Sequence, residues 1–156
     1  MKILLAVDGS ACSDAAVEEV ANRPWPFNSM VRVLNTYEMP LPPTPEAWAL
    51  PANYFDEMDQ AIRTQSQAIV NQASEKLRTK LDKTSEVVNK SVPGPPRAVI
   101  LDEADSWGAD LIVIGSHGYG RLERLLLGSV SQSVVSHAKC SVEVVRCRAS
   151  KHEEKK

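Results

Sequence analysis

The sequence predicts an α/β protein in which an open, five-stranded parallel sheet is covered by helices on both faces. Unbroken apolar runs such as Ile3–Val7 and Leu111–Ile114 are typical of strands buried on both sides. Between such runs, apolar residues recur at helical spacing, so strands and helices alternate along the chain, as they do around parallel sheets. Polar, glycine-containing turns follow the first and fourth strands, and ligands bind at this edge of such sheets.

The first predicted strand is Lys2–Val7, and the turn Asp8-Gly9-Ser10 follows it. We expect Ser10 to cap a helix that runs to about Asn22. The apolar positions of this helix fall on one face: Ala16, Val17, Val20 and Ala21. Pro24 and Pro26 end the helix, and a second strand is predicted over Val31, Val33, Leu34 and Tyr37.

Residues 39–53 form a proline-rich insert that we expect to be a loop. Its prolines, which include Pro40, Pro43 and Pro51, exclude a regular helix or an internal strand. Long loops inside compact domains are often functional. Trp48 either packs the insert onto the body of the protein or covers a ligand pocket. The first interpretation is favoured because large aromatic residues usually serve burial.

The middle of the chain contains the longest predicted helix, from about Tyr54 to Lys83. One apolar stripe runs along it, formed by Met58, Ile62, Ile69, Ala73, Leu77 and Leu81. This stripe fits a single globular packing face better than a coiled-coil seam. Glu86–Val92 is a weakly patterned third strand, which we expect near an edge of the sheet. A helix from Arg97 to Trp107 follows, and Gly108 can cap its end.

The last third of the chain begins with the fourth strand, Asp110–Gly115, and a loop that runs to Gly128. The final helix, Ser129–Ala138, is expected to bury three valines: Val130, Val134 and Val135. The fifth strand is Val142–Arg146. Residues 149–156 form a charged tail that we expect to be disordered, because its last seven positions, SKHEEKK, carry no apolar residue.

Composition and charge argue against several classes of protein. The formal net charge of −2 is opposite to the basic surface that nucleic-acid binding normally needs. No apolar run approaches the ~20 residues that span a membrane. The N-terminal apolar run is shorter than the ~7–15 residues of a signal peptide. We therefore expect a cytoplasmic protein.

The cysteines and histidines predict neither a disulfide nor a metal site. Cys12, Cys140 and Cys147 are odd in number and have no CxxC spacing, so reduced thiols are expected. Cys140 and Cys147 are interpreted as small buried apolar residues. The three histidines are scattered along the chain, which argues against a zinc site.

The loop after the fourth strand carries the chemistry of a phosphate site. Gly115 and Gly118 let the backbone approach a ligand, and Gly128-Ser129 places N–H groups and a hydroxyl at the start of a helix. The loop is not a Walker-type loop, because no lysine lies between Gly115 and Gly128. It is not a dinucleotide loop either, because Glu123 stands where a third glycine would be needed.

At this point the sequence resembles the universal stress protein family, and specifically its ATP-binding subgroup. The family motif, G-x2-G-x9-G-[ST], is matched by Gly115, Gly118, Gly128 and Ser129. The opening ILLAVDGS and the closing CSVEVVR also resemble family members, so the resemblance covers about residues 2–147. It implies a Rossmann-like fold with strand order 3-2-1-4-5. It also implies a homodimer paired through the strand Val142–Arg146, and binding of ATP with Mg²⁺ or Mn²⁺.

The resemblance also implies which residues surround the nucleotide: Ala6, Val7, Asp8, Thr36, Ile114, Gly115, Ser116, Gly118, Gly128, Ser129, Val130 and Ser131. Among these, the first-strand residues and Thr36 would face adenine and ribose, and the glycine loop would hold the phosphates. Arg121 and Arg124 either screen phosphate charge or are solvated surface residues. His117 is interpreted as a loop residue, because the sequence places no carboxylate or nucleophile beside it.

These observations lead to a hypothesis of function. A phosphate loop without an acid–base pair indicates a binding module: one ATP-binding domain over residues 1–148 that acts in stress response or signalling, with no catalytic residue and an unidentified protein partner. Two alternatives stay open, namely a slow metal-dependent ATPase or adenylate-metabolising enzyme, and a scaffold that acts without nucleotide.

Overall fold

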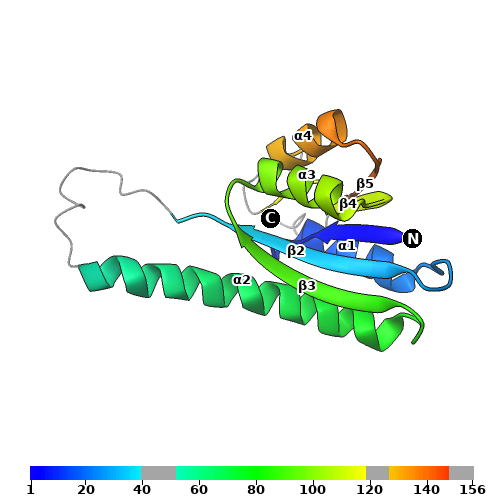
Figure 1. The fold of residues 1–156 in the computed structure, drawn as a ribbon, viewed down its shortest axis with the longest axis horizontal. Coiled ribbons are helices and arrows are strands. Elements are labelled where there is room, and N and C mark those ends of the chain that lie inside the picture. The colour runs from blue at the N-terminus through cyan, green and yellow to red at the C-terminus, as the bar shows by residue number, and fades with distance from the viewer. Residues whose placement is uncertain (40–51, 119–126, 148–156) are drawn as a thin grey trace, which may run out of the picture.

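The structure, a computed structural model, describes residues 1–39, 52–118 and 127–147. Within these residues, strands and helices alternate along the chain (Figure 1). The elements are β1 (Lys2–Ala6), α1 (Ala11–Asn22), β2 (Met30–Tyr37), α2 (Ala52–Lys80), β3 (Glu86–Pro93), α3 (Pro96–Trp107), β4 (Leu111–Gly115), α4 (Ser129–His137) and β5 (Ser141–Val145). All strand pairs are parallel, in the order β3-β2-β1-β4-β5, so the predicted fold class and strand order are confirmed.

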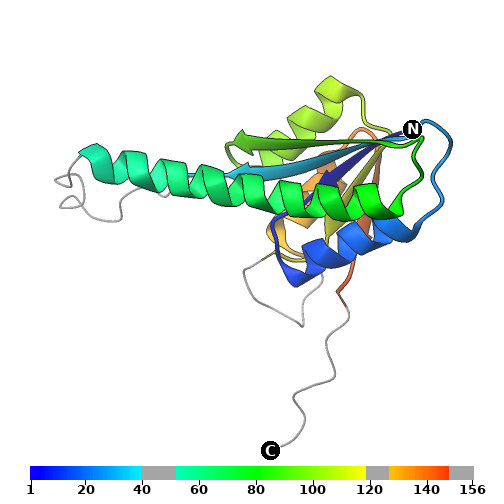
Figure 2. The same ribbon diagram turned by 90° about the horizontal axis from the view of Figure 1, so that it is seen from below.

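Two helices cover each face of the sheet. The helices α1 and α2 pack on one face, where Val20 and Leu77 bury their side chains against Ile3 and Val33. The helices α3 and α4 pack on the other face, against a core that includes Leu4 and Ile112. Figure 1 shows α2 and the α3–α4 pair on opposite sides of the strands, and Figure 2 shows the N-terminal part of α2 extending beyond the sheet.

The register of the central strands determines where the site lies. Ala6, the last residue of β1, pairs with Leu34 on one side and with Ile114 on the other. The carboxyl ends of β1 and β4 are therefore level, and the turns that follow them meet at one edge of the sheet. This arrangement brings Asp8 close to the start of the glycine loop.

Most predicted boundaries agree with the structure to within one to three residues. The strand β1 ends at Ala6 rather than Val7, and α2 spans Ala52–Lys80 rather than Tyr54–Lys83. The third strand lies at an edge, as expected. One burial prediction is wrong: Val135 is 47% exposed, because α4 turns Val134 and Ser131 toward the core instead.

The predictions for Trp48, Arg121, Arg124 and the tail 149–156 concern residues outside those that the structure describes, as does most of the proline-rich insert. Within the described residues, no helix is long and apolar enough to cross a membrane.

The prediction of three reduced cysteines is wrong. Cys12, in the first turn of α1, forms a disulfide with Cys147, which follows β5. Cys147 is thus not a packed apolar thiol, whereas Cys140 is a free, half-buried cysteine. The prediction failed because spacing rules detect only cysteines that are close in sequence, and 135 positions separate this pair.

Candidate functional site

A cavity of about 150 Å³ opens at the carboxyl ends of β1, β2 and β4. One part of its wall is apolar, with Leu34 and Ile114 from the sheet, Ile100 from α3 and Val130 from α4. The other part carries polar groups and glycines: Asp8, Ser13, Thr36, Gly115, His117 and Gly118. A lining that combines apolar side chains with a few polar groups is typical of small-molecule sites.

The turn between β1 and α1 is held by side-chain hydrogen bonds around Asp8. One Asp8 carboxylate oxygen, Oδ1, accepts hydrogen bonds from the backbone N–H of Ser10 at 2.9 Å and from its hydroxyl at 2.6 Å. The N–H of Asp8 donates to the Ser13 hydroxyl at 3.1 Å. Ser10 in turn caps α1 by accepting from the Ser13 N–H, which confirms the predicted cap.

The other carboxylate oxygen of Asp8 closes against the glycine loop. A Cβ placed on Gly118 would lie 2.5 Å from Asp8 Oδ2, which is too close for any side chain unless Asp8 moves. Gly118 is exposed and lines the cavity. A glycine at this position therefore lets the carboxylate of the first strand and the loop of the fourth strand meet at the cavity.

Gly115 has a different role, because it contacts the backbone of a helix. A Cβ on Gly115 would lie 2.7–2.9 Å from backbone atoms of Cys12 and Ser13. The first turn of α1 therefore packs directly on the end of β4. The next residue, Ser116, is buried, and its hydroxyl donates to Cys12 Sγ at 3.7 Å and lies 3.2 Å from His117 Nδ1. The Ser10 hydroxyl also reaches the His117 carbonyl, at 3.3 Å.

The start of α4 is joined to the same segment. The N–H of Gly128 donates to the Ser116 carbonyl at 2.8 Å, so the Gly128 N–H already has a hydrogen-bond partner within the protein. The Ser131 hydroxyl donates to the Gly115 carbonyl at 2.8 Å and is buried. Ser129 is exposed at the first position of the helix. The N–H groups in the first turn of a helix have no partner within the helix, so this end of α4 favours an anion.

The predicted site residues thus fall into two groups. Those that line the cavity are Ala6, Val7, Asp8, Thr36, Ile114, Gly115, Gly118 and Val130. The others, Ser116, Gly128, Ser129 and Ser131, do not line it, and three of them, Ser116, Gly128 and Ser131, take part in the hydrogen bonds described above.

Five lining residues did not belong to the predicted set: Ser13, Leu34, Pro96, Ile100 and His117. Leu34 and Ile100 look like ordinary core residues in the sequence, and only the packing of α3 over β2 brings them to the cavity. A signal for Ser13 and Pro96 did exist, because both stand in the first turn of a helix that follows a strand, at the edge where ligands bind.

The charged pairs that shift pKa values lie away from the cavity. Burial alone would raise the pKa of Glu103, but hydrogen bonds from Lys90 and Arg32 hold it below its usual range. Hydrogen bonds from Lys76 and Lys80 lower the pKa of Glu18 to about 2. These carboxylates join helices to the sheet and to each other. In the described residues no group of three His, Cys, Asp or Glu side chains is arranged to hold a metal ion.

Fold and cavity together define an α/β protein with a cavity at the carboxyl ends of its parallel strands. Comparison with known proteins identifies the family. The model of the universal stress protein family matches residues 1–146, and the chain therefore belongs to this family.

Relatives and solved structures agree. Universal stress protein YxiE from Bacillus subtilis is 28% identical over 93% of this chain and 98% of its own length. Universal stress protein A homolog 2 from Coxiella burnetii is 49% identical, but that match covers only 36% of this chain and 38% of the relative. The structure of universal stress protein UspA from Lactobacillus plantarum has a TM-score of 0.76 and 27% identity, over 94% of this chain and 97% of that one.

Two further structures of similar fold were solved with nucleotides. A universal stress protein in complex with cAMP has a TM-score of 0.63 and 22% identity, over 95% of this chain and 98% of that one. A family member from Arabidopsis thaliana with AMP bound has a TM-score of 0.64 and 21% identity, over 96% and 93%. At these identities the similarity establishes the fold.

Proposed function

We propose that this chain binds an adenine nucleotide in the cavity at the carboxyl ends of β1 and β4, with ATP as its ligand. The observation that carries the proposal is a cavity in which Asp8 meets Gly118 and shares the lining with Gly115 and apolar residues. The apolar wall offers a surface for the adenine ring. The glycine loop and the start of α4 offer backbone groups for phosphates. Relatives of the same fold with cAMP and AMP bound support an adenine nucleotide as the ligand class.

The proposal includes Mg²⁺ or Mn²⁺ bound with the triphosphate. Among the residues that the structure describes, Asp8 is the one carboxylate that lines the cavity, and one of its oxygens already accepts two hydrogen bonds from Ser10. One carboxylate fits a hard cation that takes most of its ligands from phosphate oxygens and water. It does not fit a metal ion held by the protein alone.

The biological part of the proposal is a nucleotide-dependent stress-response or signalling module in the cytoplasm, built as one domain over residues 1–148. We also propose a homodimer paired through the fifth strand. The strand β5 lies at an edge of the sheet, and an apolar edge strand is usually covered or paired. Sedimentation as a monomer at micromolar concentration would contradict this pairing.

Isothermal titration with ATP and Mg²⁺ tests the binding. We expect saturable heat with one site per chain, and mass spectrometry of freshly purified protein identifies any nucleotide that it carries. Titrations with AMP and cAMP decide between the possible adenine nucleotides. No heat with any of the three, and no retained nucleotide, would overturn the proposal. Steady release of phosphate beyond one equivalent per chain would instead indicate the slow ATPase.

A variant at the glycine loop localises the binding. Gly118→Val places a branched side chain against Asp8 at the cavity, so we expect at least a tenfold loss of affinity. The unfolding midpoint of the variant shows whether displacement of Asp8 also disturbs its hydrogen bonds to Ser10. Ser136→Val is the control, since Ser136 is exposed on α4 and does not line the cavity. Equal affinity in the two variants would exclude this cavity as the site.

A further inference from the structure

The disulfide joins two segments that both adjoin the candidate nucleotide cavity. Cys12 is 5% exposed in the first turn of α1, next to Ser13, which lines the cavity. Cys147 is half-buried and follows β5, whose last residue accepts a hydrogen bond from the N–H of Ser116 at 2.8 Å. The bond therefore fastens the segment after β5 to the start of α1, beside Ser116.

Contacts lead from the sulfur atoms to the cavity in two directions. In one, Ser116 donates its hydroxyl to Cys12 Sγ and lies beside His117, a lining residue. In the other, the backbone of Cys12 packs on Gly115, another lining residue. The position of Cys12 thus determines how closely α1 lies against the loop.

The middle of β5 is attached to the end of α1 independently of the disulfide. Arg23, just beyond α1, donates two hydrogen bonds to the Glu143 carboxylate, at 2.6 and 2.7 Å. Opening the disulfide would therefore leave β5 in place, because this ion pair and the pairing of β5 with β4 remain, and would free only Cys147 and the first turn of α1 from each other. The consequence would be confined to the edge of the sheet where the cavity lies.

We propose that Cys12 and Cys147 form a reversible thiol–disulfide site, and that the disulfide form binds nucleotide more tightly than the dithiol form. The second half of this inference rests on the proposed nucleotide binding. The bond holds α1 against Gly115 and Ser116, so the cavity is organised before the ligand arrives. In a reducing compartment a disulfide is usually transient and redox-sensing, which fits a pair located beside a ligand site.

The chemistry is exchange with a small thiol such as glutathione. Cys147 is the more exposed residue of the pair, so an external thiolate attacks Cys147 Sγ, and Cys12 leaves as a thiolate. The first turn of α1 and the Ser116 hydroxyl stabilise that negative charge. A second thiolate attacks the external sulfur of the mixed disulfide and releases the oxidised small thiol and Cys147. Two protons from the two small thiols complete the protein dithiol, and oxidation is the reverse.

The first part of the proposal, the reversible disulfide, is tested without any nucleotide. The Cys140→Ala variant is used, so that Cys12 and Cys147 are the two cysteines that remain. Samples equilibrated in glutathione buffers of graded potential are alkylated and weighed by mass spectrometry. We expect a reversible change between none and two alkylated cysteines. A pair that stays fully alkylated in oxidised glutathione, or fully bonded in excess reduced glutathione, would overturn the site.

The coupling is tested by titrating Mg²⁺ and ATP into the oxidised and the reduced protein. We expect the Kd to be at least threefold higher in the reduced form. Cys147→Ser lacks the disulfide but keeps the cavity, so it should show the weaker affinity in both buffers. Equal affinity of wild type in both states would overturn the coupling and leave the proposed function intact. Absence of binding in both states would overturn the proposed function and the coupling together, while the alkylation result would still stand for the redox site.

Discussion

Glu103 is the buried carboxylate that joins α3 to the sheet. It is 7% exposed and lies 2.5 Å from Arg32 and 2.7 Å from Lys90, while the Arg32 guanidinium stacks on Trp107. A carboxylate with two cationic partners keeps its charge despite burial. Because the partners come from β2 and β3, the group determines how α3 sits over two neighbouring strands.

We predict that Glu103→Gln lowers the free energy of unfolding by about 1–3 kcal/mol, because charged hydrogen bonds are lost and two cations keep no counter-ion. Urea denaturation followed by circular dichroism measures the change. Asp105→Asn is the control, since its ion pair with Lys139 is exposed and should contribute nothing measurable. Equal losses in the two variants would contradict a special role for the buried pair.

Glu18 makes stability depend on pH. Its pKa of about 2 lies below the usual value of 4.5, owing to hydrogen bonds from Lys76 and Lys80. As pH falls below about 4.5, the unfolded chain takes up a proton that the folded chain does not, so the unfolded state is favoured. The contribution is complete above that range and is lost as pH approaches 2. Glu103, whose pKa is also lowered, acts in the same direction.

This direction of the pH dependence leads to a prediction for a variant of Glu18. Glu18→Gln should be less stable than wild type at pH 7 by less than about 1 kcal/mol, because this ion pair is partly exposed. The difference should shrink toward zero near pH 2. Urea midpoints measured from pH 7 to pH 2 decide this, with the exposed Glu75→Gln as the control. A difference that grows at low pH would contradict the assignment.

Some of the individual residues of the site could be predicted from the sequence, and others could not. Gly115 and Gly118 were predicted from their spacing after a strand, and both line the cavity. These glycines could be predicted because the residues that define their role are close together in the sequence. Cys12 and Cys147 were misread because their contact depends on where β5 ends, a property of the whole sheet.

A buried polar cluster attaches α2 to the sheet. Ser66 of α2 donates its hydroxyl to Asn35 Oδ1 and lies beside the Ser91 hydroxyl of β3. Asn35 Nδ2 donates to the Val7 carbonyl at 2.6 Å, so the cluster reaches the end of β1. One helix is thereby linked to three strands at the edge of the sheet where the cavity lies. The residues are ordinary polar ones, and no sequence pattern indicates that they meet.

We predict that Ser66→Ala lowers the free energy of unfolding by about 1–3 kcal/mol, because a buried amide oxygen loses a donor. Ser74→Ala is a matched control on the same helix. The Ser74 hydroxyl is buried and, within the described residues, has no hydrogen-bond partner, so its removal should leave stability unchanged or slightly higher. Chemical denaturation of both variants makes the comparison. Similar losses in the two would show that packing, rather than hydrogen bonding, matters at Ser66.

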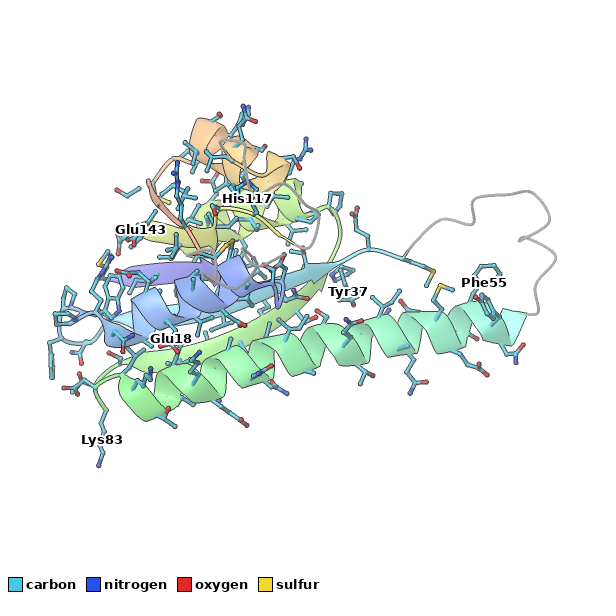
Figure 3. All side chains as sticks on the ribbon, turned by 180° about the vertical axis from the view of Figure 1, so that it is seen from behind. Glu18, Tyr37, Phe55, Lys83, His117 and Glu143 are labelled. Atoms are coloured by element: carbon cyan, nitrogen blue, oxygen red, sulfur yellow. A yellow bond between two sulfur atoms is a disulfide. The ribbon has the colours of Figure 1, made fainter. Side chains whose placement is uncertain are left out.

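Helices and strands were predicted well because their signals are periodic. The apolar stripe of α2 predicted its face, and Ile69, Ala73 and Leu77 do pack on the core. The stripe does not reveal that the N-terminal part of the helix extends beyond the sheet, where Phe55 lies (Figure 3). Periodicity identifies which face of a helix is apolar, whereas the length of the strands beneath it decides how much of that face is covered.

At the scale of the whole molecule, alternation of strands and helices predicted a parallel sheet, but the strand order came from the family resemblance. Alternation alone is compatible with more than one order. The order matters for function, because placing β4 beside β1 brings Gly115 and Gly118 to the turn that contains Asp8. It also brings Cys147 to the start of α1, so one topological feature produces both the cavity and the disulfide.

The disulfide closes almost the entire chain, since 135 positions separate its cysteines. A cross-link between residues this far apart restricts the unfolded chain strongly. The chain-entropy account predicts that it stabilises the folded state by up to about 5 kcal/mol, and removal of a native disulfide typically costs about 2–5 kcal/mol. We therefore predict a clearly lower urea midpoint for the wild-type protein in a phosphine reductant. Cys147→Ser should unfold at that lower midpoint with or without reductant, and Cys140→Ala should respond to the reductant as wild type does. Wild-type midpoints that coincide in both buffers would mean that the cross-link does not restrict the unfolded chain.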